Sequence, residues 1–207
     1  MNNKTRIAFL ANGQIDMALS NISRTVSREE QIDFVDPPYL FTAKVFYAKK
    51  GRFKTLADLG GKRIGVNQGS NAFTAAPAEL AKYSKAEPQL VSFQKNAECF
   101  VALKQGKIDA FTQDSPIVAA VVGTEGGDFE AVGAGYSPGL YSIGVPQNDS
   151  KWRYAVSVAL QSILKDGTYE RIYQSWFGQK GKYPLALNAR PRLPADAFGE
   201  MPMVWPE

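Results

Sequence analysis

The stretch ANGQIDMALS, residues 11–20, is nearly repeated as KQGKIDAFTQ, residues 104–113. Each copy contains a glycine, Gly13 or Gly106, followed by one polar residue, an Ile-Asp pair and a short apolar run. A glycine after a helical pattern is typical of the left-handed residue that ends a helix. The apolar run that follows is typical of a buried strand in a parallel sheet. The repeat therefore predicts a unit of helix, tight turn and strand that occurs twice.

The rest of the chain alternates between strand and helix patterns, which favours an α/β architecture. Asn3 and Asn96 are the predicted N-caps of the two helices that precede the repeats, and Ser150 is the predicted cap of a helix that ends at Gly167. On that last helix we expect four apolar residues to face the core. These are Trp152, Val156, Ala159 and Ile163.

Composition excludes several classes of function. The chain of 207 residues has no histidine and one cysteine, so His-based catalysis, His metal sites and an internal disulfide are excluded, and we expect neither an enzyme nor a metal or cofactor. The net charge of +4 is scattered except for residues 44–54, which we interpret as a solvated strand end and not as a nucleic-acid surface. We also predict no membrane span and no signal peptide in this chain.

Polar groups follow the first repeat directly. Ser20, Asn21 and Ser23 come at the strand end, and Arg28 lies in the first turn of the next helix. Hydroxyl and amide donors with a guanidinium suit a carboxylate, which arginine can bind through two parallel hydrogen bonds. The structural alternative is a serine-rich helix cap followed by a surface arginine.

A second group of polar residues follows later strands. Asn67, Gly69, Ser70 and Asn71 lie where a strand turns into a helix, whose N-terminus favours an anion. Asp114 ends the strand of the second repeat, where it either caps the next helix or binds a cation. Together with Arg28, it predicts a receptor for an α-amino acid.

Four segments in this order resemble the amino-acid-binding family of periplasmic solute receptors that feed ABC importers. They are GQIDMALSNISRTVSREEQIDFVDPPY (13–39), TLADLGGKRIGVNQGS (55–70), ALKQGKIDAFTQDSP (102–116) and LKDGTYERIYQSWFG (164–178). The resemblance covers about residues 3–178 and implies a two-lobed type 2 periplasmic-binding fold with hinge strands near residues 39–49 and 141–146. It also implies a periplasmic location and docking to importer membrane subunits.

The same resemblance assigns roles to the polar residues. Ser20, Asn21, Ser23, Arg28 and the turn 69–71 would hold the α-carboxylate of the ligand, Asp114 would hold the α-amino group, and Asn67 would face the cleft. Asn71 stands where the family usually has Thr, and Arg24 where it usually has Thr or an apolar residue. Either change alters the polarity of the predicted pocket.

The resemblance also suggests a division of the chain. We expect residues 1–44 and 143–178 in lobe 1, residues 45–142 in lobe 2 and a Pro-rich tail over residues 179–207. Lobe 1 would be truncated, because family members begin with a further βαβ unit, and its sheet would have an uncovered edge. We therefore expect another copy of the chain or the Pro-rich tail to cover this surface, and a homodimer in preference to a monomer. The alternatives to amino-acid capture are a dimeric interaction protein without a small-molecule ligand and, less favoured, a dehydratase-type enzyme.

Overall fold

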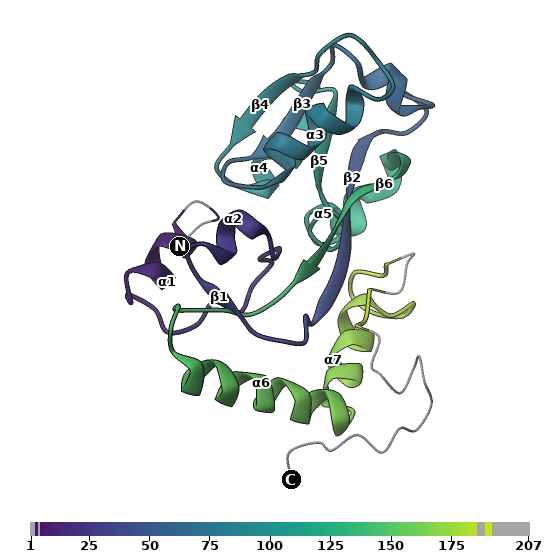
Figure 1. Ribbon diagram of the computed structural model, residues 1–207. Coiled ribbons are helices and arrows are strands. Elements are labelled where there is room, and N and C mark those ends of the chain that lie inside the picture. Colours follow the sequence, from purple (N-terminus) through teal and green to yellow (C-terminus); the bar gives the residue numbers. More distant parts are fainter. Residues whose placement is uncertain (1–2, 4, 186–188, 192–207) are drawn as a thin grey trace.

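The computed structural model describes residue 3, residues 5–185 and residues 189–191 (Figure 1). The helices are α1 (Arg6–Ala11), α2 (Val26–Glu29), α3 (Ala72–Leu80), α4 (Asn96–Lys104), α5 (Ser115–Val122), α6 (Ser150–Lys165) and α7 (Thr168–Phe177), with the 3-10 turns η1 (Leu56–Leu59) and η2 (Gly123–Asp128). The strands are β1 (Asp33–Phe34), β2 (Leu40–Lys49), β3 (Arg63–Asn67), β4 (Gln89–Phe93), β5 (Ala110–Asp114), β6 (Phe129–Tyr141) and β7 (Gly144–Val145). None of the described helices combines the length and the apolarity needed to cross a bilayer.

A five-stranded mixed sheet forms the larger part of the fold, in the order β4-β3-β5-β2-β6. Strand β3 is parallel to β4 and β5, whereas β2 is antiparallel to β5 and β6. In Figure 1 the long strands β2 and β6 leave this sheet side by side and lead toward α1, β1 and α6. This antiparallel ribbon therefore joins the two parts of the molecule.

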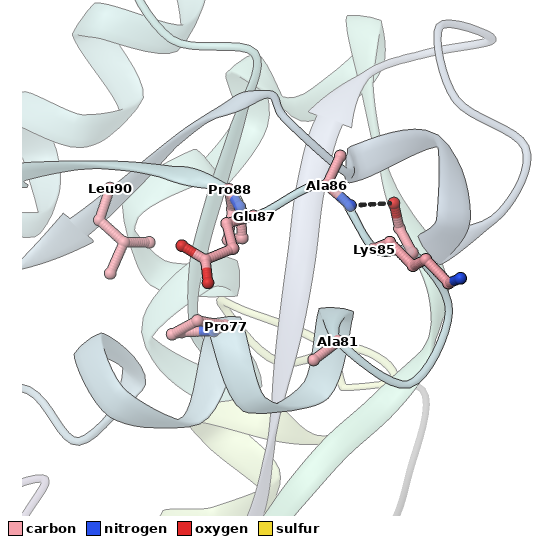
Figure 2. Close-up of a pocket in the computed structure, with 8 residues that line it drawn as sticks. Pro77, Ala81, Lys85, Ala86, Glu87, Pro88 and Leu90 are labelled. Carbon is pink, nitrogen blue, oxygen red and sulfur yellow. Dashed lines mark hydrogen bonds between the residues drawn. The ribbon is translucent and has the colours of Figure 1, made fainter.

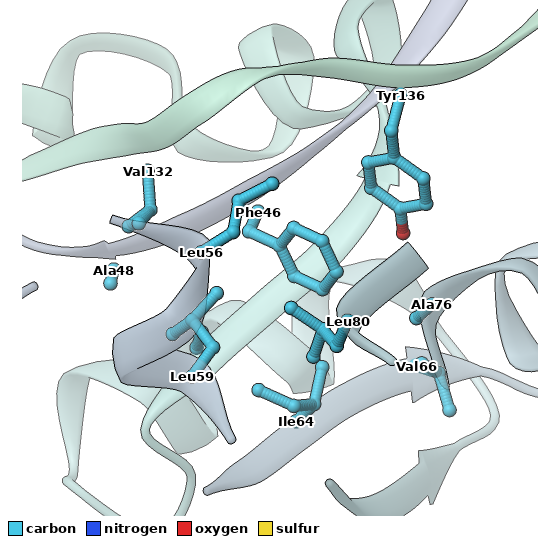
Figure 3. Packing of buried hydrophobic residues seen from close by; sticks show 11 residues of the cluster. Phe46, Ala48, Leu56, Leu59, Ile64, Val66, Ala76, Leu80, Val132 and Tyr136 are labelled. Carbon is cyan, nitrogen blue, oxygen red and sulfur yellow. The ribbon is translucent and has the colours of Figure 1, made fainter. Parts of the chain in front are cut away.

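Each face of the sheet is covered by helices. On one face Phe46 of β2 stacks on Tyr136 of β6, with ring centroids 4.7 Å apart, and both pack against η1 and α3 (Figure 3). The other face buries Phe111 of β5 against α4 and α5. Because successive strand residues point to opposite faces, the apolar run of β5 supplies both cores. This explains why the second repeat forms a buried strand.

The smaller part contains β1 and β7, which pair antiparallel, together with α1, α2, α6 and α7. Leu10 of α1 and Ile22 are fully buried in its core. Helix α6 turns Val156 and Leu160 inward, but Trp152 and Ala159 are exposed, so the predicted inward face was wrong at those two positions. The indole nitrogen of Trp152 instead donates to the backbone oxygen of Asp16, which holds the ring at the surface.

The first repeat differs from its prediction. Its helix, turn and Gly13 form as expected, and Gly13 and Gly106 have φ values of +66° and +68°. Its predicted strand does not form a ladder within the described residues, since Ala18 makes only an isolated antiparallel bridge to Gly144. A strand is held by its neighbours, and no parallel neighbour pairs with this segment in the described chain.

Helix starts also shift by one or two residues. Helix α1 begins after Thr5, and Asn3 bonds elsewhere. Helix α4 begins at Asn96 with Lys95 in the cap position, and α6 is capped by Asp149, whose side chain accepts from the backbone N–H of Trp152.

The predicted hinge and tail can be followed in part. In the ribbon β2 pairs with β6, which ends at Tyr141, so all of the second strand except Tyr141 precedes the expected hinge at residues 141–146. In the tail, Ala189 accepts from the backbone N–H of Phe41 and donates to the hydroxyl of Tyr173. Residues 186–188 and 192–207 of the tail lie outside the described residues. The division at residues 44/45 and 142/143 stays a prediction.

Candidate functional site

The polar residues after the first repeat form one cluster, and an arginine that the sequence analysis missed organises it. Arg6 of α1 donates through Nη1 to Ser20 Oγ at 3.1 Å and to Asn21 Oδ1 at 3.0 Å, and through Nη2 to the backbone oxygen of Asn21 at 2.9 Å. Arg28 of α2 donates to the backbone oxygen of Ser23 at 2.7 Å. The structure thus brings Ser20, Asn21 and Ser23 between two guanidinium groups.

The spacing of residues along α1 could have revealed that Arg6 is buried. It lies four residues before Leu10, on the helix face that packs inward, and only 5% of its surface is exposed. Burial and, to a smaller extent, the nearby positive charge of Arg28 lower the pKa of Arg6 to about 10. The Nε of Arg6 is buried without a hydrogen-bond partner among the described residues.

Arg28 differs from its neighbour Arg24 in its partners. Arg24, which stands where the family usually has Thr or an apolar residue, forms ion pairs with Glu29 and Asp36. Within the described part of the chain no carboxylate lies in ion-pair contact with Arg28. Burial lowers the pKa of Arg28, whereas the negative charge of Asp114 acts to raise it. The two predicted anchor residues therefore interact electrostatically.

Asp114 ends β5 and is the N-cap residue of α5, but its side chain makes no capping hydrogen bond. The carboxylate is 3% exposed, and its Oδ2 accepts from the hydroxyl of Tyr141 at 2.6 Å. Burial raises the pKa of Tyr141 well above its ordinary value, and the negative charge of Asp114 adds to that shift. The capping interpretation of the side chain is therefore wrong, and the carboxylate points to the β2–β6 ribbon.

Lys44 of β2 is the second partner of Asp114. Its Nζ lies 3.3 Å from Oδ1, and its side chain is 1% exposed. Placing Lys44 in a solvated basic run was wrong, because strand alternation puts it on the same buried face as Thr42 and Phe46. Despite this ion pair, Asp114 Oδ1 has no hydrogen-bond donor within the described residues.

The predicted second-lobe residues lie at the end of β3 and the start of α3. Ser70 Oγ donates to Gln113 Oε1 at 3.2 Å and accepts from the backbone N–H of Ala72, so it supports the helix start. Gly69 has a φ of +76°, which explains the glycine at this turn. Asn71 occupies the N-cap position without a side-chain capping bond.

Asn67 is buried and its amide is fully engaged. Its Oδ1 accepts from Asn3 at 2.7 Å, and its Nδ2 donates to the backbone oxygen of Gln94 at 2.9 Å. Asn3 precedes α1, whereas Asn67 ends β3, so this contact joins the smaller part of the molecule to the five-stranded sheet. A polar ligand would have to compete with Asn3 for this amide.

Four cavities along the described residues are lined by side chains other than Arg6, Arg28, Lys44 and Asp114. The one in Figure 2, of about 520 Å³, lies between α3 and the segment that leads into β4, and it is lined by Pro77, Leu90 and residues 84–88, among others. Three others, of about 420–730 Å³, contain neither Arg28 nor Asp114. In the described chain no group of three His, Cys, Asp or Glu side chains is arranged to hold a metal ion.

The sequence matches bacterial extracellular solute-binding proteins, family 3, over residues 1–179, so the chain belongs to this family. It is 29% identical to the ABC transporter glutamine-binding protein GlnH of Bacillus subtilis (84% of the chain, 62% of the relative). It is 31% identical to the ABC transporter arginine-binding protein 1 of Escherichia coli (79% of the chain, 67% of the relative). An ancestral arginine-binding protein bound to arginine superimposes with a TM-score of 0.77 at 33% identity, over 86% of this chain and 78% of that one.

These similarities confirm the α/β fold of type 2 periplasmic-binding proteins and the resemblance drawn from the sequence. These relatives are amino-acid-binding proteins of ABC transporters, and the family is described as one of extracellular solute-binding proteins. The chain spans 60–62% of the length of the first curated relatives it matches. The binding roles of the individual residues therefore stay proposals, as do the ligand and the partners.

Proposed function

We propose that this chain captures an amino acid for uptake by an ABC transporter, with the ligand held between Arg28 and Asp114. In this proposal Arg28 binds the α-carboxylate, supported by Ser20, Asn21, Ser23 and the turn at residues 69–71. Asp114 accepts a hydrogen bond from the α-ammonium group through Oδ1. Relatives with glutamine and arginine in their names support the ligand class.

One observation carries the proposal. Arg28 has no carboxylate in ion-pair contact, and Asp114 Oδ1 has no hydrogen-bond donor, in the part of the chain that is described. The two groups nonetheless lie within electrostatic range of each other, since the charge of Asp114 acts on the pKa of Arg28. A zwitterion supplies the two missing partners in one small molecule, and hydrogen bonds to charged groups are the strong ones.

Isothermal titration calorimetry with each proteinogenic L-amino acid tests this function. We expect at least one of them to bind, and Arg28→Ala and Asp114→Ala to abolish that binding. Each removes hydrogen bonds to a charged group, for which about 1.5–3 kcal/mol apiece is typical. The matched control is Arg24→Ala, which removes an arginine of the same segment that already has carboxylate partners. A folded protein that binds no proteinogenic amino acid would refute the proposal.

A second candidate function, a dimeric interaction protein, is favoured by apolar side chains at the surface. Met17 and Leu19 of the first repeat are 40% and 61% exposed, next to a backbone segment with only isolated bridges. Contact between two copies would cover them. Light scattering at micromolar concentration tests the homodimer: a dimer mass supports it, and a monodisperse monomer contradicts it. In either case we expect docking to importer membrane subunits to depend on the lobes and not on this segment.

A further inference from the structure

Lys44 is a buried cation of the site that the proposed function leaves without a role. It lies in the middle of β2, directly opposite Asp114 in the β2–β5 register, and its side chain is 1% exposed. An ammonium group has three N–H donors, and the contact with Asp114 occupies at most one of them. Among the described residues Asp114 is the partner found for this ammonium.

The charges around Asp114 do not balance. Arg6, Arg28 and Lys44 bring three positive charges to the cluster, and Asp114 is the carboxylate that the described residues place against them. Burial lowers the pKa of Arg6, and repulsion by the positive charge of Arg28 lowers it in the same direction. Buried charges are normally paired, because an uncompensated charge loses its hydration without a counter-ion. The described residues of the site therefore carry an excess of positive charge.

A neutral zwitterion does not remove this excess, since its carboxylate and its ammonium cancel. An amino acid with a second carboxylate brings one net negative charge. Its α-ammonium still meets Asp114 Oδ1 and its α-carboxylate still meets Arg28. Its side-chain carboxylate can then accept hydrogen bonds from the unused N–H donors of Lys44, which lie close to Asp114. The buried Nε of Arg6 is a further donor without a partner among the described residues.

We propose that Lys44 determines specificity, and that it makes the site select an acidic amino acid over its amide. This assignment rests on the proposed function and adds the substrate class to it. The contribution of Lys44 is a charge and a set of N–H donors next to the ammonium anchor. Neutral or basic side chains leave those donors unpaired or add a like charge beside them, which costs binding free energy.

The direct test compares L-glutamate with L-glutamine, and L-aspartate with L-asparagine, by calorimetry on the wild-type chain. Each pair differs in one group, so the ratio of dissociation constants isolates the second carboxylate. We expect the acids to bind about tenfold more tightly or better. If an amide binds as tightly as its acid, this inference is overturned while the proposed function stands. If no amino acid binds at all, the proposed function itself fails.

Variants of Lys44 show whether this residue sets the ratio. Lys44→Arg keeps a cation and should keep the preference, whereas Lys44→Met should bring the ratio close to one. The matched control is Lys49→Met, an exposed lysine at the end of the same strand, which should leave the ratio unchanged. The readout is the ratio and not the affinity, because general destabilisation weakens both ligands alike. A wild-type ratio in Lys44→Met would overturn the assignment. If Lys44→Met does not fold, the test depends on Lys44→Arg. Loss of the preference for the acids in Lys44→Arg would then overturn the assignment.

Discussion

Removing one member of the Lys44–Asp114 pair should destabilise the fold more than removing both. Lys44 Nζ and Asp114 Oδ1 are 3.3 Å apart, and both side chains are almost fully buried. At an effective dielectric constant of about 20, this separation corresponds to about 5 kcal/mol of attraction. Loss of hydration offsets much of that attraction, so the net value of the pair is small.

The single variants lack this compensation. Asp114→Asn leaves a buried ammonium without a counter-ion, and Lys44→Met leaves a buried carboxylate, so each should lower the free energy of unfolding by about 3–5 kcal/mol. The asparagine retains an oxygen that can accept from Tyr141. In the double variant neither member of this pair is left without the other, although Arg6 and Arg28 lose the charge of Asp114 as they do in Asp114→Asn. We therefore expect a smaller loss than in either single variant, which gives a coupling energy of several kcal/mol.

Urea unfolding followed by far-UV circular dichroism measures all four proteins of this cycle, with linear extrapolation to water. Lys49→Met is the control for loss of a lysine from the same strand and should be nearly neutral. Two results would refute the reasoning. One is a loss below about 1 kcal/mol in both single variants, and the other is a double variant whose loss equals the sum of the two.

Two further predictions concern stability. Arg63 holds the pKa of the Asp109 carboxyl down at about 2. The ionised Asp109 carboxyl therefore stabilises the fold above about pH 4, and this stabilisation disappears as the pH falls to 2. Asp109→Asn should lower the free energy of unfolding by about 2 kcal/mol at pH 7 and by little at pH 2. Urea unfolding at several pH values checks this, and a difference independent of pH contradicts it. Gly133 has a φ of +70°, and an added Cβ would lie 2.9 Å from Leu56 Cγ, whereas Gly13 has a φ of +66° with open space around it. Gly133→Ala should therefore cost about 2–3 kcal/mol and Gly13→Ala about 1 kcal/mol in thermal unfolding, and equal losses would contradict the role of Leu56.

The fold was predictable where local rules decide it. Both repeat glycines adopt the left-handed conformation that their positions after a helix indicate. The strand after Gly13 was not predictable by the same rule, because Ala18 depends on whether a neighbouring strand is there to pair with it. Helix caps shifted by one or two residues, as for Thr5 in place of Asn3, since several polar residues compete for each cap.

Of the candidate site, only the residues that come from one short segment of the sequence were predictable as neighbours. Arg28 and the serines before it come from one short segment, so their proximity follows from the sequence. The link from Asp114 to Lys44 and Tyr141 depends on the register of β2 against β5 and β6, which single residues do not reveal. Lys44 was misread from the composition of its run, although the alternation of its strand indicates that it is buried.

A crystal structure of the chain with a bound L-amino acid is the most direct test of the central claim. We expect an α-carboxylate oxygen within about 3 Å of the Arg28 guanidinium and the α-ammonium nitrogen within about 3 Å of Asp114 Oδ1. A ligand that contacts neither residue, for example one seated in the cavity beside α3, would contradict it.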